Sequence, residues 1–159
     1  MKNTITGVIL AGGKNSRMGT DKGLLVVDGK RIVERIAEVL KPFVDEIIII
    51  TNGNNYDYLG YSTYKDIIKD CGPMGGIHTA LTFSKTEKSF IVSCDMPFIT
   101  KELVQFIIKN SGDSEIAVPV HQERLEPLCA VYDKKCTLKL DELINNKEWK
   151  LQDALKHFK

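Results

Sequence analysis

The fold follows from the stretch ITGVILAGGKNSRMGTDKG, residues 5–23, in which an apolar run is followed directly by a loop of glycines and cationic side chains. Val8, Ile9 and Leu10 are apolar without alternation, and so is the later run 47–50. Such runs are typical of parallel strands that helices cover on both faces. We therefore expect an α/β fold with a mostly parallel sheet at its centre.

Short apolar runs alternate with amphipathic stretches from residue 5 to residue 109. The expected strands are residues 5–10, 46–50 and 90–93, and the expected helices are residues 31–41, 75–83 and 101–109. In the first of these helices the apolar side chains fall on one face, and Pro42 ends it. A βαβα rhythm of this kind predicts a doubly wound sheet with helices on both faces.

The chain changes character after residue 110. Residues 115–120 and 128–132 have the pattern of two further strands joined by a polar loop, 121–127, and helical patterns begin at Lys134 and Lys150. Pro119 has no backbone N–H to donate, so we expect the first of these strands to lie at an edge or to be bulged. No internal repeat or linker divides the 159 residues, and we expect a single domain.

The composition excludes several classes of protein. The 22 Lys and Arg residues balance 21 Asp and Glu residues, so no global field would steer the chain to nucleic acid. The four cysteines are widely spaced, which argues against a zinc knuckle or a disulfide framework. No run of about eighteen apolar residues and no signal-peptide core occurs. We expect a cytoplasmic protein with reduced thiols that binds neither membrane nor nucleic acid.

The loop after the first strand is suited to a polyphosphate. Gly12 and Gly13 let the backbone approach a ligand closely, so that successive N–H groups can point at one anion. Lys14, Arg17 and Lys22 add positive charge. The loop matches neither G-x-x-x-x-G-K-[ST] nor G-x-G-x-x-G, so neither a P-loop nor a nicotinamide site is indicated. The alternative is a solvated glycine-rich surface turn.

A second polar cluster favours the binding site over the surface turn. FIVSCDMPF, residues 90–98, places Asp95 directly after a buried strand. Taken alone, such an aspartate is more often a helix cap or a turn former. Opposite a cationic loop, however, its carboxylate could hold Mg²⁺ against phosphate oxygens. Polar segments also follow the first two strands, at 11–22 and 51–55, and we expect all three segments to meet at one crevice.

An ordered set of motifs resembles the molybdenum cofactor guanylyltransferases, nucleotidyltransferases that attach a nucleotide to molybdopterin. The motifs are LAGGKNSRMGTDKG (10–23), GKRIVERI (29–36), IIIITN (47–52), KDCGPMGGIHTAL (69–81), VSCDMPF (92–98) and EPLCAVY (126–132). These enzymes belong to the broad glycosyltransferase-A-like class that also contains nucleotide-sugar pyrophosphorylases. The resemblance implies a Rossmann-like fold of the nucleotide-diphospho-sugar-transferase type.

The resemblance also implies GTP as the nucleotide, because L-A-G-G is typical of guanylyltransferases and L-A-A-G of their cytidylyltransferase relatives. It assigns Leu10, Ala11, Gly12 and Gly13 to wrapping the nucleotide. Lys22 would contact the phosphates, Asn52 would border the base or ribose, and Asp95 would hold Mg²⁺.

A further acidic contact to the nucleotide is implied before the G-P-M-G-G turn of residues 72–76. Asp66 and Asp70 both qualify. The spacing of the family pattern favours Asp66, whereas Asp70 lies nearer to the turn. A surface acid beside Lys65 or Lys69 is the plain alternative for either residue.

The reaction implied by the resemblance is transfer of GMP from GTP to the terminal phosphate of molybdopterin, with release of pyrophosphate. Arg17 and Lys22 would stabilise the charge on the leaving pyrophosphate, and Arg124 in the later strand region could meet the pterin phosphate. Arg124 could equally be an exposed hairpin charge. Other partners would be proteins of molybdenum cofactor biosynthesis or acceptor enzymes.

One departure from the family pattern concerns the acceptor side. Members typically continue into a segment with an N-x-N-T motif, which the sequence up to Lys159 does not contain. We therefore expect a nucleotide-binding part of about residues 1–100 and a shortened acceptor part of about 101–159. Two alternatives stay open: a nucleotidyltransferase for another acceptor or nucleotide, such as CTP with molybdopterin or a sugar phosphate, and a non-catalytic GTP-binding module.

Overall fold

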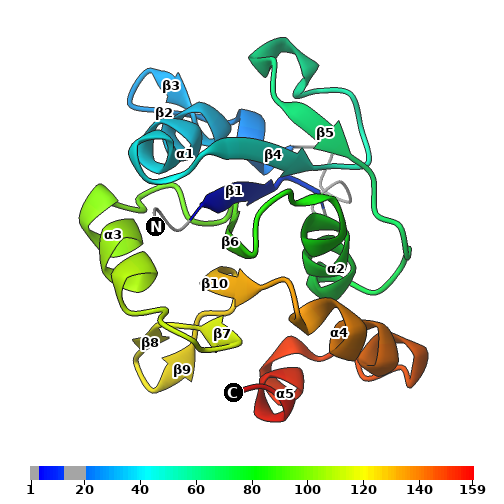
Figure 1. Cartoon of the computed structure of the whole chain (residues 1–159). Helices are drawn as coiled ribbons and strands as arrows, with labels where there is room; N and C mark the ends of the chain where they lie inside the picture. The colour runs from blue at the N-terminus through cyan, green and yellow to red at the C-terminus, as the bar shows by residue number, and fades with distance from the viewer. Residues whose placement is uncertain (1–3, 13–20) are drawn as a thin grey trace.

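The computed structural model describes residues 4–12 and 21–159. At its centre is a six-stranded sheet in the order β5-β4-β1-β6-β10-β7 (Figure 1). The strands are β1 Ile5–Leu10, β4 Glu46–Ile50, β5 Ser62–Tyr64, β6 Lys88–Ser93, β7 Ile116–Ala117 and β10 Cys129–Asp133. Pairing is parallel among β5, β4, β1 and β6, whereas β10 is antiparallel to both β6 and β7. The predicted mostly parallel α/β sheet is confirmed.

Helices cover both faces of this sheet (Figure 1). The helices are α1 Ile32–Leu40 and α3 Lys101–Lys109 on one face, and α2 Pro73–Phe83, α4 Cys136–Asn145 and the short α5 Leu151–Ala154 on the other. Ile9 and Ile49 are buried with α1 and α3, whereas Val8 and Ile48 are buried with α2 and α4. This burial on both faces is the reason why the central strands are apolar without alternation.

The predicted helices are confirmed with shifts of one or two residues at their ends, except for α3, which has the predicted bounds. α1 begins at Ile32 because Arg31 is still extended, and the Glu34 carboxylate accepts a hydrogen bond from Arg31 N (3.0 Å). α2 begins at Pro73, directly after Gly72 with its positive φ of 59°. Proline suits the first turn of a helix, where its missing N–H has no partner to lose. Among the described residues, no helix combines the length and the apolar character that a membrane crossing requires.

Short hairpins flank the sheet. They are β2 Val26–Val27 with β3 Lys30–Arg31, and β8 Val120–His121 with β9 Arg124–Leu125. Short 3₁₀ helices occur at Lys22–Leu24, Lys41–Phe43, Asp57–Leu59 and Leu155–His157. The first of these 3₁₀ helices and the β8–β9 hairpin position residues of the candidate site.

The structure differs from the predicted pattern between residues 115 and 127. The predicted strand 115–120 is divided into β7 and β8 around Pro119, because proline cannot donate to a sheet ladder. The expected loop 121–127 contains β9. The β8–β9 hairpin closes through Gln122 and Glu123, whose φ angles are 48° and 63°. Turns with two positive φ angles usually carry Asn-Gly or Asp-Gly, so the sequence offers no signal for this hairpin.

Candidate functional site

The carboxyl ends of β1, β4 and β6 meet at one edge of the sheet, where ligands bind in open α/β folds. Backbone hydrogen bonds continue past the strands there. Ala11 N donates to Ile50 O (2.9 Å), and Cys94 N donates to Leu10 O (3.2 Å). The predicted meeting of the three polar segments is confirmed for those of their residues that the structure describes.

Lys22 and Asp95, 73 positions apart in the sequence, are brought together at this edge. Lys22 Nζ lies 3.1 Å from Asp95 Oδ1, and the two side chains are 48% and 50% exposed. The turn that carries Asp95 is held by a side chain of the preceding strand, because Asp95 N donates to the Ser93 hydroxyl Oγ (3.2 Å). An ion pair this exposed contributes little to stability. Both groups are therefore accessible to a charged ligand.

Asn52 and Asp66 form a second polar pair at the end of β4. Asn52 Nδ2 donates to Asp66 Oδ2 (3.2 Å), and Asp66 N donates to Asn52 Oδ1 (3.1 Å). Asp66 also reaches α2, since a Cβ placed on Gly76 would lie 3.8 Å from Asp66 Oδ1. Asp70, with φ of 62°, makes no such bond to Asn52 within the described part of the chain. The structure thus places Asp66, and not Asp70, beside Asn52.

The end of β1 leads into the predicted nucleotide loop. Leu10 is buried in the core on the α2 side, Ala11 is half-buried and Gly12 is exposed. A Cβ on Gly12 would lie 3.7 Å from Thr51 Cα, which is ordinary contact, so packing against residues 4–12 and 21–159 does not require a glycine here. Gly13 and Arg17, together with Lys14, lie outside the described residues.

Tyr56 and Asp21 complete this edge, and neither is a predicted site residue. Tyr56 is fully buried, and its hydroxyl donates to Asp21 Oδ1, which also accepts from Gly23 N (3.2 Å). Burial, followed by the bond to Asp21, raises the pKa of Tyr56, so the phenol stays a neutral donor. A tyrosine in the asparagine-rich stretch 52–58 carries no sequence signal for this contact.

Cys94 lies between these polar groups but does not have the character of a nucleophile. It is 5% exposed, and burial raises the pKa of its thiol to about 12, with Asp21 and Asp95 adding to the rise. A thiol in such surroundings stays protonated and inert. Cys94 is therefore a packing residue of this site.

The G-P-M-G-G turn packs α2 tightly against the sheet. A Cβ on Gly75 would lie 2.8 Å from Ile68 O, and one on Gly76 would lie 3.2 Å from Leu10 Cδ2. The two glycines therefore have a structural reason to be glycine. His78 on the same helix is buried, and its Nε2 lies 2.6 Å from Asp141 Oδ1 of α4, so it joins two helices.

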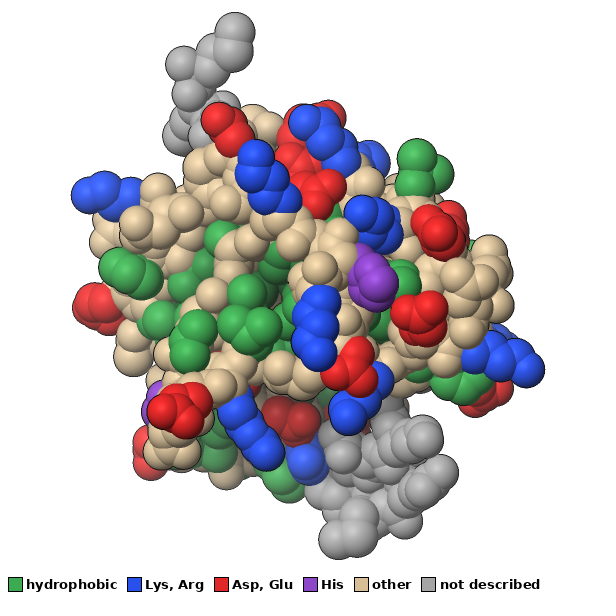
Figure 2. Space-filling view, turned by 90° about the horizontal axis from the view of Figure 1, so that it is seen from below, with side chains coloured by type: hydrophobic (Ala, Val, Ile, Leu, Met, Phe, Trp, Pro, Cys, Tyr) green, Lys and Arg blue, Asp and Glu red, His purple; other side chains and the backbone are tan. Residues whose placement is uncertain are grey.

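Arg124 lies in β9 and lines a pocket of about 330 Å³. Its lining residues are Pro73, Arg124, Leu125, Glu126, Pro127, Leu128, Lys150, Leu151 and Gln152. The pocket therefore joins the start of α2, the β9 segment and α5. Figure 2 views the molecule from the side where α5 and the β8–β9 hairpin lie in Figure 1, and hydrophobic side chains gather at the centre of this face with charged ones around them.

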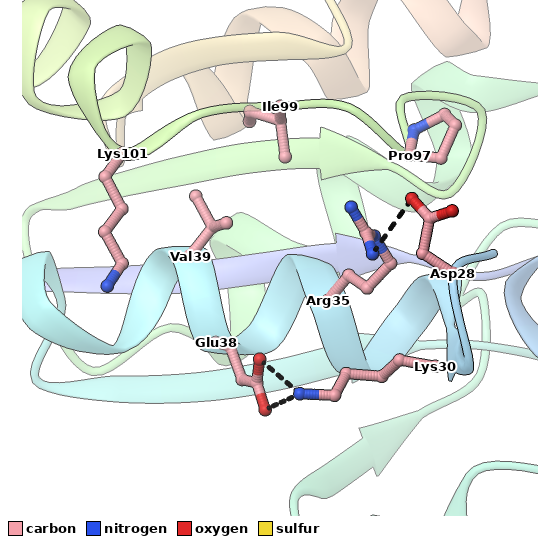
Figure 3. A pocket seen from close by; sticks show the side chains of 8 residues that line it. All are labelled: Asp28, Lys30, Arg35, Glu38, Val39, Pro97, Ile99 and Lys101. Atoms are coloured by element: carbon pink, nitrogen blue, oxygen red, sulfur yellow. Dashed lines mark hydrogen bonds and ion pairs between the residues drawn. The ribbon is translucent and has the colours of Figure 1, made fainter.

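A second pocket, of about 300 Å³, lies between α1, the β2–β3 hairpin and the segment before α3 (Figure 3). None of the predicted site residues lines it. Lys30 Nζ is 2.7 Å from Glu38 Oε1, and the Arg35 guanidinium points toward Asp28 at 3.9 Å. Most of its charges are thus compensated by neighbouring side chains, and the strand-end residues remain the better candidate site.

The strand-end site could hold a metal ion through Asp95. Within residues 4–12 and 21–159, no three His, Cys, Asp or Glu side chains form a ready-made metal centre. Mg²⁺ does not need one, because it is usually held by one or two carboxylates with water and substrate phosphates. The nucleotidyltransferases that the sequence resembles typically use a divalent metal ion. The half-exposed Asp95 carboxylate, with Lys22 beside it, fits that mode of binding.

Comparisons with known proteins show the family and the fold of this chain. The model of the MobA-like NTP transferase domain matches residues 7–158. A protein of Flavobacterium johnsoniae described as a "probable molybdenum cofactor guanylyltransferase" is 40% identical over 153 residues, which cover 96% of this chain and 80% of the relative. Two crystal structures share the fold.

The first of these structures is Aq1419 from Aquifex aeolicus VF5, with a TM-score of 0.84, 30% identity and coverage of 100% of this chain and 85% of that one. The second is molybdopterin-guanine dinucleotide biosynthesis protein A from Archaeoglobus fulgidus, with a TM-score of 0.77, 23% identity and coverage of 96% and 80%. The predicted family, fold class and nucleotidyltransferase class are confirmed. The chain belongs to the MobA-like NTP transferase family.

Proposed function

We propose that this protein transfers GMP from GTP to the terminal phosphate of molybdopterin and releases pyrophosphate. The observation that carries the proposal is the Lys22–Asp95 pair, a cation and a carboxylate 3.1 Å apart at the ligand-binding edge of a nucleotidyltransferase sheet. The guanylyltransferase name of the Flavobacterium relative supports GTP as donor and the molybdenum cofactor as acceptor.

In the proposed reaction, an oxygen of the molybdopterin phosphate attacks the α-phosphorus of GTP. The bond between that phosphorus and the α–β bridging oxygen breaks, and pyrophosphate leaves with the electron pair. A phosphate monoester is already nucleophilic near neutral pH, so the chain need not supply a base. Its contribution is to position the two substrates and to neutralise charge.

The charge is neutralised by groups at the strand ends. Lys22, with Arg17 of the preceding loop, would hold the β- and γ-phosphates and stabilise the pyrophosphate as it leaves. We propose Mg²⁺ as the metal, held by Asp95 together with water and phosphate oxygens, where it would neutralise phosphate charge.

The nucleotide would be positioned by the neighbouring segments. The backbone of Leu10, Ala11, Gly12 and Gly13 would wrap the triphosphate. The Asn52–Asp66 pair would face the ribose or base, since each of these side chains is already oriented by the other. Asp66 is preferred to Asp70 for this reason.

The acceptor would occupy the pocket that contains Arg124. Leucine and proline side chains form much of its wall, while Arg124 and Lys150 supply cations. This combination suits a flat heterocycle that carries a phosphate. The division into a nucleotide part of about residues 1–100 and an acceptor part of about 101–159 follows from these two assignments.

We also propose that the protein works in the cytoplasm and passes its product to acceptor enzymes or other proteins of molybdenum cofactor biosynthesis. Its four cysteines are all free and buried. Free thiols suit a reducing compartment.

The nucleotide assignment is tested by thermal unfolding with GTP, CTP, ATP or UTP, each with and without Mg²⁺. A nucleotide that binds the folded protein and not the unfolded chain raises the melting temperature, so the nucleotide that binds most tightly gives the largest rise. We expect a rise with Mg²⁺ and GTP that is lost in Asp95→Asn but kept in Glu38→Gln. Glu38 is a matched control because its pair with Lys30 is similarly exposed, at 43% and 56%.

The outcomes separate the alternatives. A higher melting temperature with CTP in place of GTP would indicate a cytidylyltransferase. An unchanged melting temperature with every nucleotide would overturn the proposed site. Binding of GTP without pyrophosphate release in the presence of molybdopterin would indicate a non-catalytic module. Pyrophosphate release with a sugar phosphate in its place would indicate another acceptor.

A further inference from the structure

The buried hydroxyl of Tyr56 is a polar group that the proposed reaction does not use. Tyr56 follows β4 and is fully buried in the core on the α1 side of the sheet. A buried polar group costs free energy unless it is hydrogen-bonded. The hydroxyl meets that need by donating to the carboxylate of Asp21, a residue 35 positions earlier in the sequence.

Asp21 connects this bond to the segment that carries Lys22. Its Oδ1 accepts from both the Tyr56 hydroxyl and Gly23 N, and so Asp21 caps the 3₁₀ helix Lys22–Leu24. Lys22 lies between Asp21 and Gly23 in the chain, and the bond from Gly23 N to Asp21 Oδ1 closes over it. The direction of the Lys22 backbone is therefore fixed from both sides.

Gly23 shows how closely the segment is packed. A Cβ at this position would lie 2.9 Å from Cys94 Sγ and closer still to the Tyr56 hydroxyl. The backbone at Gly23 thus lies directly on the two side chains that follow β4 and β6. Lys22 reaches Asp95 from this packed base.

We propose that Tyr56 is a positioning residue that acts through Asp21 to hold Lys22 where it meets the phosphates of the bound nucleotide. The proposal rests on the phosphate contact assigned to Lys22 under the proposed function. Tyr56 is suited to this task because its phenol is neutral, and because water cannot compete for its buried bond. Tyr56 itself would not touch the nucleotide.

The test is a double-mutant cycle between Tyr56→Phe and Lys22→Ala, read as the affinity for GTP with Mg²⁺ by isothermal titration calorimetry. Phe fills the same space and removes only the donor. Tyr56→Phe should weaken GTP binding about tenfold, because Lys22 loses the bond between Tyr56 and Asp21 that holds its segment in place for the phosphates. In the Lys22→Ala background the same change should have almost no effect, because the group it positions is gone.

Tyr132→Phe is the matched control. Tyr132 is also fully buried, and its hydroxyl donates to Pro127 O (2.7 Å) in the core on the opposite face of the sheet. Both variants lose one buried hydrogen bond, so both should unfold at a lower temperature. GTP affinity should stay within about twofold of the wild type only in Tyr132→Phe, because one lost core bond acts mainly on stability.

A second pair of variants keeps the test decisive if Tyr56→Phe does not fold. Asp21→Asn retains an acceptor oxygen and should preserve GTP affinity, whereas Asp21→Ala should lower it as Tyr56→Phe does. Equal losses of affinity from Tyr56→Phe with and without Lys22, or none at all, would overturn the positioning role. If Lys22→Ala binds GTP like the wild type, or the wild type binds none, the proposed function fails and this inference fails with it.

Discussion

Replacement of Gly23 by alanine tests the packing beneath Lys22 most severely. The added Cβ would meet Cys94 Sγ at 2.9 Å and would press against the Tyr56 hydroxyl, and both partners are buried. Overpacking a core costs about 1–3 kcal/mol, and loss of a hydrogen bond to a carboxylate costs about 1.5–3 kcal/mol. We expect Gly23→Ala to lower the free energy of unfolding by about 3 kcal/mol. For a chain of this length that corresponds to a fall of about 6–12 °C in melting temperature.

The assay is urea unfolding followed by circular dichroism, with Gly53→Ala as the control. The nearest atom to a Cβ on Gly53 is Asn55 Nδ2 at 4.0 Å, so this change should stay within about 0.5 kcal/mol of the wild type. In Gly23→Ala/Tyr56→Phe the hydroxyl that meets the new methyl group is absent. The double variant should be more stable than the sum of the two single losses predicts, by about 1 kcal/mol. A Gly23→Ala protein as stable as Gly53→Ala would refute this account of the packing.

Three further predictions concern the same edge of the sheet. Lys22→Ala should change the free energy of unfolding by less than about 1 kcal/mol, because the ion pair between Lys22 and Asp95 is half-exposed. Calorimetry should nevertheless show that Lys22→Ala binds GTP more weakly than the control Lys30→Ala does. Gly12→Ala should leave the free energy of unfolding unchanged, because the added Cβ would lie 3.7 Å from Thr51 Cα, its nearest described neighbour. It should weaken GTP binding at least about tenfold, because the backbone must approach the phosphates closely at this position. Unchanged GTP binding would show that Gly12 is not part of the site. Burial raises the pKa of the Cys94 thiol from 9.0 to about 12. The contribution of this thiol to the free energy of unfolding is therefore complete below pH 9 and is lost between pH 9 and 12, because the unfolded chain releases the proton first. Urea titrations should show that stability falls less steeply between about pH 9 and 10 in Cys94→Ala than in the wild type, and identical slopes would contradict this.

The central sheet is predictable from sequence because its strands are buried on both faces. Ile47, Ile48, Ile49 and Ile50 are apolar in succession, and the structure divides them between two cores. The strand-end segments could be predicted to converge for the same reason, since parallel neighbours end at one edge. The fold class thus predicts that the loop containing Lys22 starts near Asp95, and the structure supplies the 3.1 Å contact between the two side chains.

The remaining features depend on contacts that leave no local pattern. Gln122 and Glu123 form a hairpin turn without the glycine or asparagine that usually indicates one. Tyr56 and Asp21 are 35 positions apart, and no local sequence pattern around either residue predicts their hydrogen bond. The spacing of the family pattern favours Asp66 over Asp70, and the structure adds the two hydrogen bonds that join Asp66 to Asn52.

The most direct test of the central claim is transfer of labelled GMP from α-labelled GTP to molybdopterin, measured for the wild type and for Asp95→Asn. We expect a labelled dinucleotide and an equal amount of pyrophosphate from GTP, with little product from CTP and a large loss in Asp95→Asn. Efficient transfer from CTP in place of GTP, or undiminished transfer by Asp95→Asn, would contradict it.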